Sequence, residues 1–135
     1  MRWLGLDIGS ARIGVALGDD DGGIASPWSV IDARSWESAK EEIVHVMEKE
    51  SVDGLVIGIP KPLHDQERMT DQAKEIEERA VDLEALGLPV ERENETLSSA
   101  QAATWQRERG QSGKRDDLAA CAILQTFLDR RRLQA

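Results

Sequence analysis

Residues 4–18 read Leu4-Gly5-Leu6-Asp7-Ile8-Gly9-Ser10-Ala11-Arg12-Ile13-Gly14-Val15-Ala16-Leu17-Gly18. Two apolar runs flank Gly9 and Ser10, and this pattern predicts two strands joined by a short turn. One carboxylate, Asp7, interrupts the first apolar run. A strand aspartate beside a glycine turn is a setting in which proteins handle metal ions and phosphates, so Asp7 indicates where to look for chemistry.

The rest of the chain predicts three strands in succession and then alternating helices and strands. We expect strands at residues 2–8, 12–18, 24–31, 54–58 and from 89, and helices at 36–49, 68–86, 98–109 and 116–132. Consecutive strands with short turns indicate an antiparallel meander, whereas strands separated by helices indicate parallel pairing. The expected fold class is α/β: a mixed five-stranded sheet, three antiparallel strands and then parallel ones, with helices on both faces.

Three segments that are distant in the sequence are expected to meet at one edge of this sheet. Asp7 lies at the end of the first strand, residues 57–60 close the fourth, and residues 94–96 close the fifth. In open α/β sheets, ligands bind at the carboxyl ends of strands where the strand order reverses. We therefore expect the functional site at this edge.

Length and composition indicate a globular protein, because 135 residues fit one domain, residues 1–135, with a core of its own. No apolar run approaches the roughly 20 residues that span a bilayer. The N-terminus runs directly into a strand pattern, which leaves no room for a signal peptide. We expect a cytoplasmic protein without a membrane partner. The one cysteine, Cys121, excludes an internal disulfide and is interpreted as a small core residue.

The net charge of −9 argues against nucleic-acid binding over the whole surface, but the charge is unevenly distributed. Residues 105–135 hold seven basic and four acidic side chains, a net +3, which leaves −12 for the remainder. Two interpretations of Arg130, Arg131 and Arg132 stay open. They contribute to a basic surface for phosphates, or they form a solvated helix end that complements the helix dipole.

Four motifs in this order and spacing resemble the YqgF/RuvX family. They are Leu6-Asp7-Ile8-Gly9-Ser10 with Ile13-Gly14-Val15-Ala16, Val56-Ile57-Gly58-Ile59-Pro60, Asn94-Glu95-Thr96-Leu97-Ser98-Ser99, and Asp116 with Ala119, Ala120, Ile123, Leu124 and Gln125. The resemblance covers nearly the whole chain. It implies an RNase H-like fold and a nuclease, either of pre-16S rRNA in 5′-end processing or of branched DNA as a Holliday junction resolvase in recombination.

The resemblance also implies a catalytic and metal-binding triad of Asp7, Glu95 and Asp116. Hydrolysis of a phosphodiester needs an activated water and a stabilised leaving oxygen, and two divalent ions about 4 Å apart supply both. Carboxylates are suitable ligands for Mg²⁺ or Mn²⁺, so we expect one of these ions as cofactor. We expect nucleic-acid contacts from Gly9, Ser10, Arg12, Lys114 and Arg115.

Each triad position has an alternative interpretation. Asp7 would otherwise be a structural aspartate that accepts hydrogen bonds from turn amides. Asp117 competes with Asp116, because both lie on apolar helix faces and periodicity cannot choose between them; either would also serve as an N-terminal helix charge. Glu91 and Glu93 precede Glu95, and the plain interpretation of Glu91-Arg92-Glu93 is an exposed strand edge.

The sequence departs from the family pattern at two positions next to Glu95. Asn94 and Thr96 stand where the family usually has aspartate and arginine, and residues 61–68 also differ from the usual loop. Loss of that arginine removes one candidate phosphate contact.

We expect a metal-dependent nuclease acting on structured RNA or branched DNA, as a monomer or a homodimer. Two other functions stay open. A non-catalytic nucleic-acid-binding or ribosome-assembly factor would fit the acidic balance and the missing arginine. A sugar-kinase or actin-like ATPase has a similar phosphate loop, but such enzymes need two domains of this kind.

The basic loop at residues 110–115 generates a first prediction. Replacing Lys114 and Arg115 by alanine is expected to weaken nucleic-acid binding and to reduce the slope of log affinity against log salt by about one per lost phosphate contact. Filter binding at several salt concentrations measures this slope. An unchanged slope would remove both residues from the interface.

Overall fold

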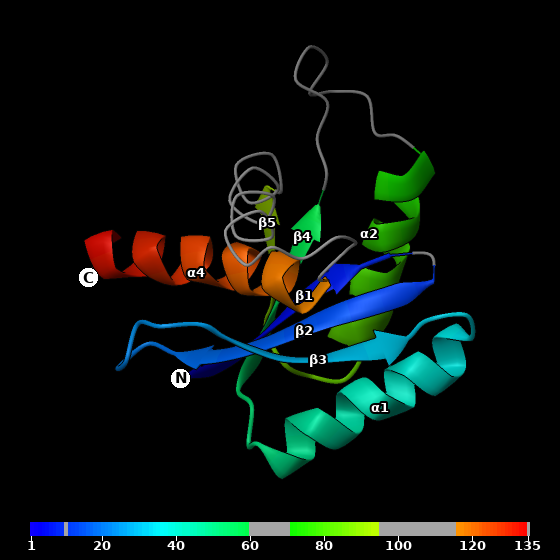
Figure 1. Cartoon of the computed structure of the whole chain (residues 1–135), viewed down its shortest axis with the longest axis horizontal. Coiled ribbons are helices and arrows are strands. Elements are labelled where there is room, and N and C mark those ends of the chain that lie inside the picture. The colour runs from blue at the N-terminus through cyan, green and yellow to red at the C-terminus, as the bar shows by residue number, and fades with distance from the viewer. Residues whose placement is uncertain (10, 60–70, 95–115, 135) are drawn as a thin grey trace, which may run out of the picture.

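The computed structural model describes residues 1–9, 11–59, 71–94 and 116–134. It contains a five-stranded sheet with helices on both faces (Figure 1). The strands are β1 (Arg2–Ile8), β2 (Arg12–Asp19), β3 (Ser26–Asp32), β4 (Gly54–Ile59) and β5 (Val90–Asn94), and the described helices are α1 (Trp36–Lys49), α2 (Asp71–Glu84) and α4 (Asp116–Gln134).

The strand order is β3-β2-β1-β4-β5. β1 pairs antiparallel with β2, and β2 pairs antiparallel with β3. β4 lies parallel to β1 on its other side and parallel to β5. The predicted mixed sheet, a meander followed by parallel strands, is confirmed.

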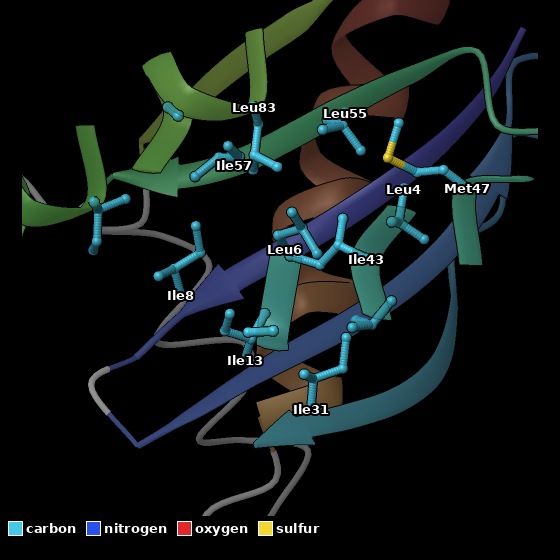
Figure 2. Close-up of a cluster of buried hydrophobic side chains, with 14 of the residues drawn as sticks. Leu4, Leu6, Ile8, Ile13, Ile31, Ile43, Met47, Leu55, Ile57 and Leu83 are labelled. Carbon is cyan, nitrogen blue, oxygen red and sulfur yellow. The ribbon is translucent and has the colours of Figure 1, made fainter. Parts of the chain in front are cut away.

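One face of the sheet packs against α1 and α2. Even-numbered residues of β1, such as Leu4 and Leu6, lie fully buried on this face with Ile43 of α1 and Leu83 of α2. Figure 2 shows these side chains gathered on one side of the strands, with α4 behind the sheet. Because side chains alternate along a strand, the odd-numbered residues of β1, including Asp7, lie on the other face.

The other face packs against α4, which crosses the sheet (Figure 1). Gly5 makes this approach possible, because a Cβ placed there would lie 2.8 Å from Cβ of Leu124 and 3.1 Å from the carbonyl oxygen of Ala120. The helix is apolar over most of its circumference, and residues 118, 120–124, 127 and 128 are all buried.

The last turns of α4 are held by polar contacts with the sheet. Gln125 accepts a hydrogen bond from the backbone N–H of Ala25 and donates one to the carbonyl of Gly23. Arg131 donates to both carboxylate oxygens of Asp20, at 3.0 and 3.1 Å, and its guanidinium carbon lies 5.1 Å from the centre of the Trp3 ring.

Several element boundaries differ from the prediction by one or two residues, and two of these differences have a clear structural cause. The third strand begins at Ser26 rather than residue 24, because the backbone at residues 23–25 is hydrogen-bonded to Gln125 of α4. The second helix ends at Glu84 rather than residue 86, and the N–H of Gly87 closes the helix on the carbonyl of Glu84. Gly87 has φ +92°, a left-handed conformation that suits glycine at a helix end.

β2 and β3 do not pair in one continuous register. Val15 lies opposite Ser29, whereas Ala16 lies opposite Pro27, so Trp28 falls in a bulge between them. Its side chain is 43% exposed. The helix predicted at residues 98–109 lies outside the described residues. In the parts of the chain that the structure describes, no helix has the length and apolarity to cross a bilayer.

Gly5→Ala tests the contact between α4 and the sheet. The added methyl group would overlap Leu124, so the free energy of unfolding should fall by about 1–3 kcal/mol. Urea denaturation measures the loss. Gly22→Ala is the matched control, because its methyl group would meet only the flexible carboxylate of Asp19. Equal stability of the two variants would contradict the close approach.

The Asp20–Arg131 pair predicts a pH dependence of stability. Burial of Asp20 opposes its ionisation, but the hydrogen bonds and charge of Arg131 hold the pKa of this carboxyl below its ordinary value of 3.8. A lowered folded-state pKa stabilises the fold above the unfolded pKa, and the effect disappears as pH falls through the folded value. Asp20→Asn should therefore be less stable than the parent at about pH 7. The difference should shrink below about pH 4 in denaturant titrations. A difference that persists at low pH would exclude the ionised carboxylate as its cause.

Candidate functional site

Asp7 lies near the carboxyl end of β1, the central strand of the sheet. It pairs with Gly14 of β2, and its neighbour Leu6 pairs with Ile57 of β4. Asp7 is half-buried and lies on the face of the sheet that packs against α4. It is therefore a carboxylate on a rigid strand at the edge where the sequence predicts a site.

The turn that follows Asp7 is built around Gly9. Its N–H donates to the carbonyl oxygen of Arg12 at 2.9 Å, and a Cβ at residue 9 would lie 2.8 Å from that oxygen. Any larger residue at position 9 would place its Cβ against the first residue of β2, so the turn requires glycine there. Its predicted nucleic-acid contact stays a prediction, and Ser10 lies outside the described residues.

Arg12 is exposed at the start of β2. It borders an open groove of about 480 Å³ that is also lined by Ala11, Val30, Asp32 and Arg34. The Arg34 guanidinium donates to both carboxylate oxygens of Asp32 and holds the pKa of Asp32 at about 2. The described lining of the groove thus includes two guanidinium groups and one carboxylate, on a chain that is acidic overall.

The interpretation of Glu91-Arg92-Glu93 as an exposed strand edge is wrong for Glu93. Glu91 is exposed, but Glu93 is only 3% exposed and is the one charged residue that counts as buried within the described ranges. Arg130 of α4 donates to both of its carboxylate oxygens, at 2.9 and 2.5 Å. Because this two-point contact occupies both oxygens, Glu93 is a poor competitor of Glu95 as a metal ligand.

Arg92 is also paired, but on the opposite face of the sheet. Its guanidinium donates to Glu77 of α2, with the shortest contact at 2.6 Å, and forms an ion pair with Glu84. These contacts raise the already high pKa of Arg92, chiefly through the hydrogen bond to Glu77. The end of β5 is therefore held by ion pairs on both faces.

The structure does not support an entirely solvated end for α4. Arg130 pairs with Glu93 of β5, and Arg131 pairs with Asp20, the residue after β2. Both arginine charges are therefore balanced by carboxylates. Sequence analysis missed both pairs. Their partners are 37 and 111 residues away, and no local pattern signals contacts of that range.

The other two predicted triad members are Glu95 and Asp116. Asp116 is the first residue of α4, but its side chain lies outside the described set, as do Glu95, Lys114 and Arg115. Asp117 is half-buried, and its carboxylate accepts a hydrogen bond from the N–H of Leu118 at 3.0 Å. The choice of Asp116 over Asp117 stays a prediction, because α4 is buried on both of their faces.

Among the residues whose side chains the structure describes, no three His, Cys, Asp or Glu groups lie close enough to hold a metal ion. Of the expected ligands, this set contains Asp7 alone. Its hard oxygen donor suits Mg²⁺ or Mn²⁺, as would the two carboxylates predicted to join it. The donor chemistry therefore fits a divalent ion.

The fold is similar to that of known resolvases. RuvC from Thermus thermophilus superposes with a TM-score of 0.61 at 17% identity, over 99% of this chain and 97% of that chain. The fowlpox virus Holliday junction resolvase gives a TM-score of 0.57 at 11% identity, over 96% and 99%. At these identities the similarity concerns the fold, and it confirms the expected RNase H-like architecture.

Curated relatives are closer in sequence. A protein of Chloroflexus aurantiacus named "Putative pre-16S rRNA nuclease" is 36% identical over 96% of this chain and 87% of its own length. A protein of the same name from Anaeromyxobacter is 38% identical over 97% and 98%. The profile of the family described as RuvX, Holliday junction resolvase, matches residues 1–130. On this match and these identities, the chain belongs to the RuvX family.

Proposed function

We propose that this protein is a metal-dependent nuclease that hydrolyses phosphodiester bonds in structured RNA or branched DNA. The proposal is supported by the family match and by relatives named as pre-16S rRNA nucleases. A fold neighbour, RuvC of Thermus thermophilus, is described in complex with a Holliday junction substrate. Processing of the 5′ end of pre-16S rRNA and resolution of branched DNA are therefore the two candidate roles.

One observation carries the proposal: the position of Asp7. Asp7 is a half-buried carboxylate near the carboxyl end of the central strand, on the sheet face covered by α4. It pairs with Gly14 of β2, and its neighbour Leu6 pairs with Ile57 of β4. Such a scaffold fixes a ligand more closely than a loop does.

Asp7, Glu95 and Asp116 would hold the Mg²⁺ or Mn²⁺ ions, with Asp117 as the alternative to Asp116. When bound, two such ions would activate a water and stabilise charge on the leaving oxygen. The chain itself would contribute three carboxylates from separate segments, and these would repel one another without a cation. Arg12, Lys114 and Arg115 would bind phosphates, and Gly9 and Ser10 would allow close approach of the backbone. No covalent intermediate with the protein is needed.

The groove beside Arg12 supports an approach of the substrate along β3. Among its described lining residues, Arg12 and Arg34 bring guanidinium groups to the groove, and guanidinium groups suit contacts with a phosphate backbone. Trp28 lies farther along β3 with an exposed side chain, a feature that sequence analysis did not single out. This surface would bind the phosphate groups of the backbone, which RNA and DNA have in common.

Asp7→Asn is expected to reduce cleavage at least about 100-fold, because a neutral amide is a poor ligand for a hard divalent cation. The assay uses purified protein with Mg²⁺ or Mn²⁺ and a panel of pre-rRNA, single-stranded and four-way-junction substrates. A second readout is thermal unfolding. Mn²⁺ should raise the melting temperature of the parent protein and have a much smaller effect on the variant.

Asp21→Asn is the matched control, since it makes the same chemical change at an exposed turn residue. It should keep both cleavage and the response to Mn²⁺. Full activity of Asp7→Asn would remove Asp7 from the mechanism. Binding of nucleic acid by the parent protein without metal-dependent cleavage would favour the non-catalytic assembly factor.

A further inference from the structure

We propose that Trp28 stacks on an unpaired base of the bound nucleic acid, while Arg12 and Arg34 in the neighbouring groove contact its phosphates. This surface would favour RNA or DNA that carries single-stranded nucleotides next to the cleavage site. The inference rests on the proposed function, because it takes the bound nucleic acid to be the substrate of the site at Asp7. A fully paired duplex would offer phosphates to the arginines but no open base face to the indole.

Trp28 differs from the other tryptophans in the described ranges. Trp3 is 1% exposed and packs in the core, and Trp36 is partly buried and donates its indole N–H to Asp82 of α2. Trp28 is 43% exposed, and Val30, two residues farther along the same edge strand, is 45% exposed. Proteins on average bury most of a tryptophan ring, so an exposed ring beside a second exposed apolar residue indicates a contact surface.

A bulge in β3 determines how Trp28 is presented. Val15 lies opposite Ser29 and Ala16 lies opposite Pro27, so Trp28 is the extra residue between the two pairs. An extra residue bends the strand and re-aims a side chain, and such bulges are frequent beside functional sites. The ring of Trp28 is therefore carried by a strand and not by a loop, which suits a residue that must hold a base in one orientation.

The strand register places Val30 of this surface on the same face as Asp7. Asp7 pairs with Gly14 of β2, and Gly14 pairs with Val30, so the three residues form one row across three strands. Ile31 is buried toward α1, so its neighbour Val30 faces the other side of the sheet. With strands about 4.8 Å apart, the Cα atoms of Asp7 and Val30 are roughly 10 Å apart. A polymer bound along β3 would therefore reach the candidate site.

The groove next to Val30 supplies groups that suit phosphates. Its described lining includes Arg12 and Arg34, and Arg12 lies opposite Asp32 in the register of β2 and β3. The Asp32 carboxylate accepts hydrogen bonds from Nε and Nη2 of Arg34, whose side chain is 82% exposed. This contact orients the guanidinium, and a guanidinium has five N–H donors, more than the contact uses. Arg34 is thus held at the surface in a form that can bind a phosphate.

The spacing of the indole and the arginines suits a short single-stranded segment. Trp28 is four residues from Asp32, the partner of Arg12, which corresponds to roughly 13 Å along a strand. Proteins that bind single strands combine a cationic groove for the backbone with aromatic rings on which bases stack. The presence of guanidinium groups beside the exposed indole favours nucleic acid over an apolar protein partner.

Equilibrium binding measured by fluorescence anisotropy tests the stacking contact. The probes are a labelled single strand and the blunt duplex of the same sequence, each prepared as RNA and as DNA, in EDTA so that no cleavage occurs. Trp28→Ala should weaken binding of the single strand at least about fivefold and leave binding of the duplex within about twofold, because stacking needs an open base face. Trp28→Phe keeps an aromatic face and should retain most of the affinity.

Two further variants separate stacking from other causes. Trp28→Leu keeps an apolar side chain without an aromatic face, so it should lose affinity as Trp28→Ala does, and it replaces Trp28→Ala if that variant does not fold. Val81→Ala is the matched control, because it truncates an exposed apolar side chain of α2, on the other face of the sheet. It should bind both probes as the parent protein does.

Salt dependence separates the base contact from the phosphate contacts. Trp28→Ala should keep the parent slope of log affinity against log salt, since stacking on a base releases no counterions. Arg12→Ala should lower this slope by about one, because it removes one phosphate contact. A loss of affinity on Trp28→Ala with both polymers, or with one of them, supports the contact, and the second result also assigns the polymer.

The possible failures differ from one another. Unchanged affinity of Trp28→Ala for the single strand, or an equal loss with the blunt duplex, would overturn the stacking role and leave the nuclease proposal intact. Unchanged affinity together with an altered sedimentation coefficient of the protein alone would assign Trp28 to an interface between copies instead. A parent protein that binds the single strand through Trp28 but cleaves no substrate with Mg²⁺ or Mn²⁺ would overturn the nuclease proposal and leave the base contact. A parent protein that binds neither probe would overturn both.

Discussion

The structure depends on how closely α4 packs against β1, and this distance is set by the missing side chain at Gly5. With hydrogen alone at that position, Leu124 and the backbone of Ala120 come to lie directly over the central strand. Between Leu118 and Leu128 the helix then buries most of its circumference, which accounts for the predominance of apolar residues there. The same contact brings the helix that begins at Asp116 onto the sheet face that carries Asp7, so packing and the proposed chemistry share one constraint.

The two faces of the sheet differ in their charged residues. The apolar face toward α1 and α2 comprises aliphatic side chains of the strands, many of them drawn in Figure 2. On the α4 face, by contrast, carboxylates meet arginines where the helix leaves the sheet. Arg130 reaches β5 and Arg131 reaches the turn after β2, so consecutive residues hold the helix in two directions. A chain with a net charge of −9 thus uses part of its limited positive charge to hold its own elements together.

Much of the fold could be predicted from local patterns. The meander, the buried fourth strand and the helix at residues 36–49 follow from short-range periodicity and turn residues, and the structure has them at those positions. The predicted start of the third strand was two residues too early. The backbone N–H of Ala25 donates to the side chain of Gln125, 100 residues away, and local sequence does not reveal this contact. Glu93 could not be recognised as buried for the same reason: its environment is decided by Arg130 and not by its neighbours in sequence. Asp7 could be selected because a carboxylate in an apolar strand stands out locally, whereas the choice between Asp116 and Asp117 offers no such contrast.

The bulge at Trp28 has a consequence for how molecules of this protein behave toward one another. β3 forms a border of the sheet, and such a border can act as a template on which another extended chain adds. Here the register shift interrupts the regular sequence of backbone donors and acceptors, and Pro27 has no N–H to offer. Exposed Trp28 and Val30 can thus remain in water along this border without seeding fibrous self-association.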